Sequence, residues 1–227
     1  VLSTSDPIAA GIIKSAEDSG CDNVHARVDP VRHERQIQIF HDIIGFKKLG
    51  IFYEDTDAGR SYAALDKVKK VAAERGFELI VCHTIDDVPD VKQAEESVLK
   101  CAEELSAKVD AIYVTQQNGV SAENLPKLVA IVNKHRIPTF AQAGSEEVKE
   151  GILLSISQAG FKADGKFHAE NIAKILNGAK PRDLEQTFES PPKIAINLAT
   201  ASIIGFDPPI DALGAADEIY QEIESPA

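Results

Sequence analysis

Short apolar runs alternate with segments of helical periodicity five times between residues 48 and 180. The runs are residues 48–53, 77–83, 111–115, 137–141 and 152–157. Runs that are apolar on both faces, each followed by an amphipathic helix, are typical of a parallel sheet covered by helices on both sides. Because crossovers between parallel strands are right-handed, the sequence predicts an open, doubly wound α/β sheet of flavodoxin-like strand order.

Helix boundary signals follow these runs. We expect a first helix from Ser61, with Tyr62 and Leu65 on its apolar face, and we expect it to end at Gly76. The helix after the second run is expected to start near Asp90, which is suited to the N-cap position.

The two ends of the chain hold further elements but not a second complete sheet. Residues 1–5 are compatible with a strand, and Asp6-Pro7 and Asp29-Pro30 each have the form of an N-cap followed by a proline that opens a helix. Beyond Pro181, residues 194–198 form another apolar run, and an amphipathic segment follows. A partial second domain built from both ends of the chain fits this order best.

The chain is acidic, with 24 Lys and Arg against 36 Asp and Glu, which gives a formal net charge of −12. Such a surface repels phosphate backbones and anionic lipid, so nucleic acid and a membrane surface are poor candidates for the partner. No run approaches the roughly 18 apolar residues that a membrane span needs. The sequence opens at Val1 without an initiator Met or a signal-peptide core.

Cys21, Cys82 and Cys101 form no CxxC pair and have no metal-binding spacing. Cys82 lies in an apolar run, and Cys101 lies on the apolar stripe of an expected helix. The interpretation that we favour is that these are buried free thiols and not disulfide partners.

Small polar loops follow four of the five expected strands. Ligands of open parallel sheets bind beyond the carboxyl ends of the strands, so a site is expected in these loops. Their amides, hydroxyls and helix N-termini suit neutral or anionic ligands that carry oxygen. One such loop is equally consistent with an ordinary solvated turn, but four on one edge favour a site. The loops are residues 54–62, 116–119, 142–145 and 158–161.

Catalytic motifs are missing from the sequence. It contains no GxSxG, HExxH or GxGxxG, and no GxxxxGK followed by Ser or Thr. Asp55 and Asp57 lack the spacing of metal-dependent phosphotransfer sites and are better explained as solvated turn carboxylates. The six histidines are scattered, so we expect no metal and no cofactor. The sequence favours a binding protein over an enzyme.

Several segments together carry a family resemblance. They are Gly50–Tyr53, Asp110–Val114 with Asn118, Arg136–Ala141, Ala173–Pro181, Ile196–Ala201 and the opening Ser3–Gly11. Together they resemble one group of ABC-transporter substrate-binding proteins, some of which bind aromatic amino acids such as tryptophan. The resemblance covers nearly the whole chain, although each segment alone is a weak signal.

The resemblance implies a two-lobed, periplasmic-binding-protein-like fold with one complete lobe and part of a second. Residues 1–47 are then the end of the N-terminal lobe and the hinge, 48–180 the C-terminal lobe of five βα units, and 181–227 the return to the N-terminal lobe with a C-terminal helix. About a hundred further residues are expected before Val1, with the export signal of a periplasmic protein or lipoprotein. We expect an ABC permease as the partner, a monomer at full length, and weak ligand binding by this chain alone.

The family's ligand contacts lie in the loops that match Asp57–Ser61 and Gln116–Asn118. Members often show Thr-Asp-Asn in the second loop, so Asn118 is kept while Gln117 replaces the carboxylate. An Asp there would pair with a ligand ammonium through a bond about twice as strong as a neutral one, so an α-amino acid ligand is disfavoured. Arg60 is either a partner for a ligand carboxylate or a solvated surface residue. The expected ligand-binding residues are Ser5, Asp6, Thr56, Asp57, Arg60, Ser61, Gln116, Gln117, Asn118, Gln142, Ser145 and Gln158.

Three functions are weighed on this basis. The leading one is the solute-binding component of an ABC importer, which holds a small polar or aromatic ligand between two lobes. The second is the ligand-sensing core of a transcription regulator, which shares the two-lobed fold. The third is a flavodoxin-like enzyme that acts through Asp55 or Asp57.

Overall fold

The computed structural model describes residues 7–8, 10–158, 161–189 and 192–225. The chain forms two compact units, and each is described on its own. The larger unit contains residues 34–157 and 193–227, and the smaller unit contains residues 1–33 and 158–192.

A seven-stranded sheet in the order β2-β1-β3-β4-β5-β6-β7 forms the centre of the larger unit. The strand pairs β1–β2, β1–β3, β3–β4, β4–β5 and β6–β7 are parallel. The order of the first five strands confirms the predicted flavodoxin-like, doubly wound arrangement. The strands are β1 (Lys48–Glu54), β2 (Glu78–Thr84), β3 (Ala111–Val114), β4 (Thr139–Ala141), β5 (Leu154–Gln158), β6 (Pro192–Asn197) and β7 (Glu218–Tyr220).

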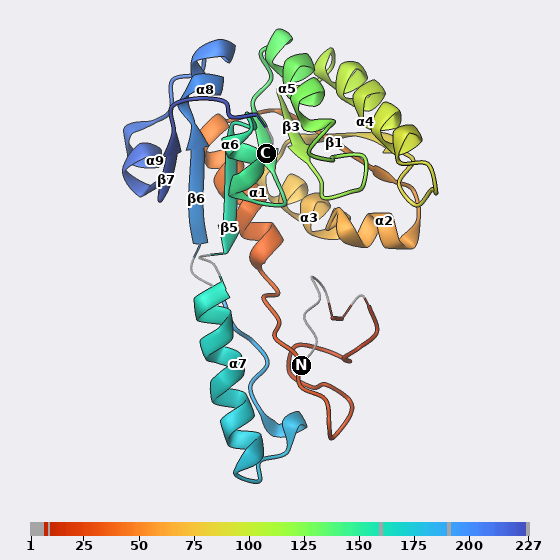
Figure 1. Ribbon diagram of the computed structural model, residues 1–227, viewed down its shortest axis with the longest axis vertical. Coiled ribbons are helices and arrows are strands. Elements are labelled where there is room, and N and C mark those ends of the chain that lie inside the picture. The colour runs from red at the N-terminus through yellow and green to blue at the C-terminus, as the bar shows by residue number, and fades with distance from the viewer. Residues whose placement is uncertain (1–6, 9, 159–160, 190–191, 226–227) are drawn as a thin grey trace. The chain divides into compact units, whose positions relative to one another are not determined.

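Helices cover both faces of this sheet (Figure 1). On one face, Ile37 and Phe40 share a core cluster with Val68. On the other face, Val98 and Leu128 belong to a second cluster. These residues lie on α1, α3, α4 and α5, so the predicted amphipathic stripes are the faces that pack on the sheet. The helices are α1 (Arg32–Ile44), α2 (Asp57–Tyr62), α3 (Leu65–Arg75), α4 (Val91–Ser106), α5 (Leu125–Lys134), α6 (Ser145–Lys149), α8 (Leu198–Ile204) and α9 (Ile210–Ala215).

The helix expected from Ser61 to Gly76 is broken into α2 and α3. Ala64 between them has a φ of 50°, in the left-handed region, and this turns the chain between the two helices. Tyr62 therefore does not share the buried face of Leu65 and is 59% exposed. The expected end is confirmed, because Gly76 caps α3 with a φ of 74°.

Several expectations for the two ends of the chain need correction. The described residues after Asp6 form turns and bends rather than a helix, while Asp6 and the strand expected over residues 1–5 lie outside the described residues. The helix expected at Asp29-Pro30 is present but begins at Arg32. At the other end, the amphipathic segment ends in strand β7 rather than in a helix, because Glu218–Tyr220 pairs with β6.

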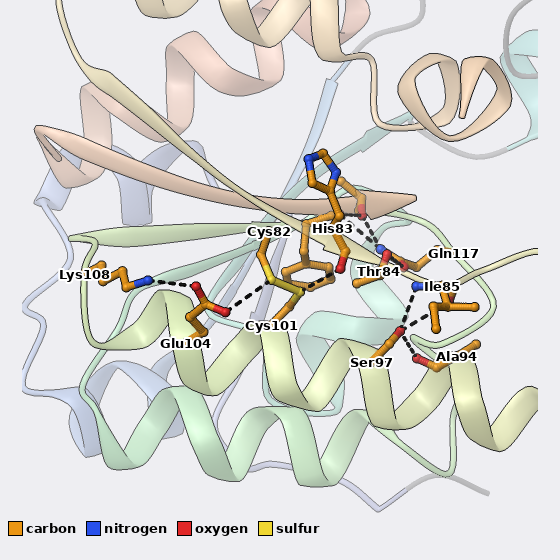
Figure 2. The surroundings of a disulfide bond; sticks show 12 residues. Cys82, His83, Thr84, Ile85, Ala94, Ser97, Cys101, Glu104, Lys108 and Gln117 are labelled. Atoms are coloured by element: carbon orange, nitrogen blue, oxygen red, sulfur yellow. Dashed lines mark hydrogen bonds and ion pairs between the residues drawn. A yellow bond between two sulfur atoms is a disulfide. The ribbon is translucent and has the colours of Figure 1, made fainter. Parts of the chain in front are cut away.

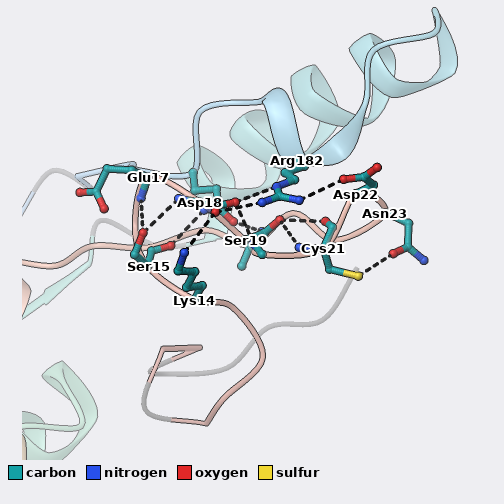
Figure 3. Close-up of polar contacts among 12 residues, drawn as sticks. Lys14, Ser15, Glu17, Asp18, Ser19, Cys21, Asp22, Asn23 and Arg182 are labelled. Carbon is teal, nitrogen blue, oxygen red and sulfur yellow. Dashed lines mark hydrogen bonds and ion pairs between the residues drawn. The ribbon is translucent and has the colours of Figure 1, made fainter.

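Helix α7 (Phe161–Leu176) and the 3₁₀ turn η1 (Pro181–Asp183) belong to the smaller unit. Arg182 of this turn donates to Asp18 at 2.8 and 3.1 Å and to Asp22 at 3.2 Å (Figure 3). These bonds tie the turn to a loop more than 150 residues earlier in the chain. The two compact units are defined by contacts and do not assign the lobes of a complete protein, so the expected lobe boundaries at residues 47 and 180 stay a prediction.

The preference for free thiols is wrong for two of the three cysteines. Cys82 on β2 and Cys101 on α4 form a disulfide (Figure 2). The packing of α4 against β2 brings the two side chains together although 19 residues separate them in sequence. Cys21 is free, but it is exposed rather than buried. No helix in the described part of the chain is long and apolar enough to cross a membrane.

Candidate functional site

The carboxyl ends of β1, β2 and β3 meet at one edge of the sheet because these neighbouring strands are parallel. The loops that follow them surround a small pocket. Two of the twelve expected ligand-binding residues, Gln116 and Gln117, line it. Its lining consists of Tyr53, Glu54, Gly59, Tyr62, Ala63, Asp86, Thr115, Gln116 and Gln117.

The loop after β1 is held by its own side chains. The Oγ1 atom of Thr56 accepts a hydrogen bond from Gly59 N at 3.0 Å and caps α2. Arg60 donates to Asp55 at 2.6 and 3.0 Å and to Asp57 at 3.0 Å. The guanidinium of Arg60 therefore already has two carboxylate partners on the protein surface. This pairing favours the role of a surface residue over that of a partner for a ligand carboxylate. Ser61, also on α2, does not line the pocket.

Gln117 is bonded within the protein at the position where the family often has Asp. Its Nε2 atom donates to Phe52 O at 3.1 Å and to Thr115 Oγ1 at 2.7 Å. Its Oε1 atom accepts from Thr84 Oγ1 at 2.7 Å (Figure 2). The Gln117 amide therefore joins the ends of β1, β2 and β3, and this bonding accounts for the presence of an amide at this position.

Gln142 plays a similar part at the end of β4. It is 4% exposed. Its Oε1 accepts from Gln116 N at 2.8 Å, and its Nε2 donates to Tyr62 O at 2.7 Å. The Gln142 side chain thus fixes two walls of the pocket relative to each other.

Asp86 lines the pocket and was not among the expected residues. Its Oδ1 atom accepts from Asn118 N at 2.6 Å, and Asn118 Nδ2 donates to Asp86 O at 3.3 Å. The Glu54 carboxylate accepts from the backbone N–H groups of Asp86 and Asp87 at 3.0 and 3.2 Å. These bonds join the loops after β1, β2 and β3.

The two pocket carboxyls have opposite electrostatic environments. Burial raises the pKa of Asp86, and the nearby charges of Glu54 and Asp87 add to this effect. The hydrogen bond from Asp86 N lowers the pKa of Glu54, because it favours the ionised carboxylate. The signal that would have found Asp86 is its place in the loop after the second apolar run, the one strand-end loop that the sequence interpretation passed over.

The remaining expected residues lie apart from the pocket or outside the description. Ser145 begins α6 and does not line the pocket. Gln158 ends β5, and its side chain is outside the described part of the structure, as are Ser5 and Asp6. No group of three or more His, Cys, Asp or Glu suited to a metal ion occurs among the described residues.

The protein-family model for ABC transporter substrate binding proteins matches residues 1–218. The chain belongs to this family. It is therefore the solute-binding component of an ABC transporter, in a family that is extracytoplasmic and that binds substrates rather than converting them. The family match therefore favours the solute-binding function over the ligand-sensing core of a transcription regulator. No curated protein matches the chain.

Solved structures similar to this substrate-binding protein show the same fold. A conserved domain protein from Vibrio cholerae has 23% identity and a TM-score of 0.73, with coverage of 95% of this chain and 69% of that one. The ABC domain from Streptococcus pneumoniae in complex with L-Trp has 24% identity and a TM-score of 0.70, covering 94% and 70%. A ligand-free, open substrate-binding protein with adhesive properties from Clostridium difficile has 24% identity and a TM-score of 0.71, covering 96% and 69%.

Proposed function

We propose that this substrate-binding protein captures a small polar or aromatic solute at the carboxyl ends of β1, β2 and β3 and delivers it to a membrane ABC permease. The observation that carries the proposal is the pocket at this edge, which combines the aromatic rings of Tyr53 and Tyr62 with the polar groups of Asp86 and Gln116. Aromatic walls with a few polar groups are the usual composition of small-molecule sites. The hollow itself has a volume of about 10 Å³, so it forms only part of such a site and the solute must extend beyond it.

Closure of two lobes around the solute completes the proposed cycle. A ligand shifts a protein toward a closed state only if it makes more favourable contacts in that state. Loops bonded to one another at the strand ends are suited to this role, since they present one preformed surface. In the family, the permease then receives the closed, loaded form.

We propose that the protein binds its solute without converting it. The polar side chains around the pocket are engaged in bonds that fix the loops, as for Gln117 with Thr84 and Gln142 with Tyr62. Side chains held in this way are suited to shaping a site, whereas a catalytic base must be free to exchange a proton with its substrate.

We place the protein in the periplasm or on the outer face of a membrane as an anchored lipoprotein. The Cys82–Cys101 disulfide supports this placement, because disulfides persist in oxidising compartments and are rare in the cytosol. A monomer is the proposed state at full length.

A thermal-shift panel tests the proposed function. The panel contains aromatic amino acids, aromatic amines, aromatic acids, short amides and sugars, and binding to the folded state raises the melting temperature. Native mass spectrometry of the protein as purified would show a co-purified solute directly. Full-length protein that is unshifted by every compound and carries no solute would contradict the proposal, because only weak binding is expected of this chain alone. Turnover of a compound that is lost on changing Asp55 or Asp57 would also contradict it.

A further inference from the structure

The strand-end loops of the larger unit hold more negative charge than they can neutralise themselves. Residues 54–61, 84–88, 115–119 and 142–145 contain a single Lys or Arg, which is Arg60. Arg60 is bonded to Asp55 and Asp57 at 2.6 and 3.0 Å. Arg60 forms no ion pair with Glu54 or Asp86, the two carboxylates that line the pocket.

Asp86 is the pocket carboxylate with the greater capacity for a further partner. Within the described chain, no Lys, Arg or His lies within ion-pair distance of Asp86 or Glu54. Glu54 uses both of its oxygens, with Oε1 accepting two backbone N–H groups and Oε2 accepting from Thr56. Asp86 receives its bond from Asn118 N on Oδ1, and the backbone N–H of Gly119 also lowers the pKa of its carboxyl. Its carboxylate is partly buried and lies beside the like charges of Glu54 and Asp87, so a cation would stabilise its ionised form.

Two aromatic rings line the same pocket. Tyr53 is almost completely buried, and its ring forms a T-shaped pair with the ring of His83, with the ring centroids 5.3 Å apart. Tyr62 is 59% exposed. Its backbone carbonyl accepts a hydrogen bond from Gln142 Nε2, which holds the end of α2 in place. Aromatic faces attract cations and also bury apolar groups, so the rings suit a ligand that has both.

The same loops hold no positively charged side chain that is available to an anionic ligand, although their amides and hydroxyls led us to expect that neutral or anionic ligands would suit them. The guanidinium of Arg60 is taken by two carboxylates, and the amides of Gln117 and Gln142 are bonded to Thr84, Thr115 and backbone groups. A ligand carboxylate placed here would lie beside Asp86 and Glu54 without a compensating cation, and like charges in a partly buried site repel strongly.

Resting on the proposed solute-binding function, we infer that Asp86 sets the ligand preference of this pocket by binding the ammonium group of a cationic amine whose apolar part contacts Tyr62. The site takes organic amines in preference to organic acids of the same shape. Asp86 reaches the pocket from the loop after β2, whereas the amide of Gln117 holds the strand ends in place.

A matched pair of probes tests this assignment. Phenethylamine and hydrocinnamate have the same phenyl and ethylene groups and opposite charges. NMR titration of the chain, followed through backbone amides including Asn118 and Gly119, measures even millimolar dissociation constants. We expect phenethylamine to bind at least about tenfold more tightly than hydrocinnamate, which corresponds to about 1.4 kcal/mol, because only the amine gains a charge-assisted hydrogen bond with Asp86.

Asp86→Asn is the decisive variant, because the Asn side-chain oxygen still accepts from Asn118 N while the charge is removed. It should weaken phenethylamine binding about tenfold or more. The exposed neighbour provides the control, and Asp87→Asn should change binding by less than about threefold because exposed charges are strongly screened. If Asp86→Asn lowers the melting temperature severely, Asp86→Glu keeps the charge and should retain the preference for the amine.

Three outcomes would overturn the assignment of Asp86. They are equal or tighter binding of hydrocinnamate, unchanged amine binding in Asp86→Asn, and no amine binding at millimolar concentration. The proposed function is tested separately by the thermal-shift panel. A sugar, amide or acid that shifts the melting temperature when no amine does leaves the solute-binding role standing and refutes the preference for amines.

Discussion

A disulfide joins Cys82 on the edge strand β2 to Cys101 on the helix α4 that covers it. Two residues after Cys82, Thr84 donates to Gln117 at 2.7 Å and so links the end of β2 to the pocket. The cross-link therefore holds the strand that leads directly to Asp86.

Reduction of this disulfide should destabilise the protein. A cross-link that closes a loop of about this size contributes roughly 3 kcal/mol by restricting the unfolded chain. Urea unfolding with and without dithiothreitol measures the loss, and Cys101→Ser should reproduce it without reductant. Cys21→Ser is the matched control, because Cys21 is exposed and free. Equal stability of the oxidised and reduced protein would contradict the expectation.

Gln142→Leu should lower stability and loosen the pocket. The substitution leaves Gln116 N and Tyr62 O without the partners that the Gln142 amide provides at 2.8 and 2.7 Å. An unsatisfied buried polar group costs about 1–3 kcal/mol. Chemical denaturation gives the stability. Gln116→Leu is the control, because the Gln116 side chain is exposed, and a loss of similar size in that variant would remove the special role of Gln142.

Glu147 should make stability fall as the pH rises. Its Oε2 atom is buried without a hydrogen-bond partner among the described residues. Burial, aided by Glu150, raises its pKa in the folded protein from the ordinary value of 4.5 to about 8. Between these values the unfolded chain has already released the proton that the folded chain keeps, so the free energy of unfolding decreases by up to about 1.4 kcal/mol per pH unit.

Glu147→Gln should remove this pH dependence and gain stability relative to the native protein above pH 5. Urea unfolding at pH 5 and pH 8 compares the two proteins, with Glu146→Gln as the control because Glu146 is an exposed neighbour on α6. The same difference between the two pH values in Glu147→Gln and in the native protein would show that another group is responsible.

Gly59→Ala should disturb the loop after β1. A Cβ atom at this position would lie 2.0 Å from Glu54 O, so α2 has to move away from the strand end. Overpacking of this kind costs about 1–3 kcal/mol. Gly165→Ala is the matched control, since no atom beyond its chain neighbours and the adjacent backbone of α7 lies within 4 Å of its Cβ position, and Ala favours a helix by up to about 1 kcal/mol over Gly. In thermal unfolding, the melting temperature should fall in Gly59→Ala and rise in Gly165→Ala.

The alternation of apolar runs and amphipathic helices was sufficient to predict the first five strands of the sheet, but β6 and β7 of the same sheet were expected in a partial second domain. Phe52 and Ile112 are apolar and buried because their strands are covered on both faces, and that property is readable from the sequence. The break at Ala64 was not readable. Neither Ala63 nor Ala64 is a helix breaker, so the sequence carries no local signal for the left-handed conformation of Ala64.

The candidate site was harder to predict than the fold. A sequence shows that Gln117 and Gln142 are polar, but it does not show whether backbone groups of distant strands already satisfy them. The sequence does show that Asp86 lies in a strand-end loop, the one after the second apolar run. Its hydrogen bond with Asn118 could not be predicted, because that bond depends on the strand order, which brings the two loops together. The Cys82–Cys101 pair likewise required the packing of α4 on β2.

The smaller unit is assembled from two stretches of chain, residues 1–33 and 158–192, and the larger unit supplies the 124 residues between them. Three covalent connections consequently run between the units, at residues 33–34, 157–158 and 192–193. A single backbone cleavage at any of them leaves two tethers intact. No continuous stretch of the gene encodes the smaller unit alone, and producing it separately requires a new peptide link between residues 33 and 158.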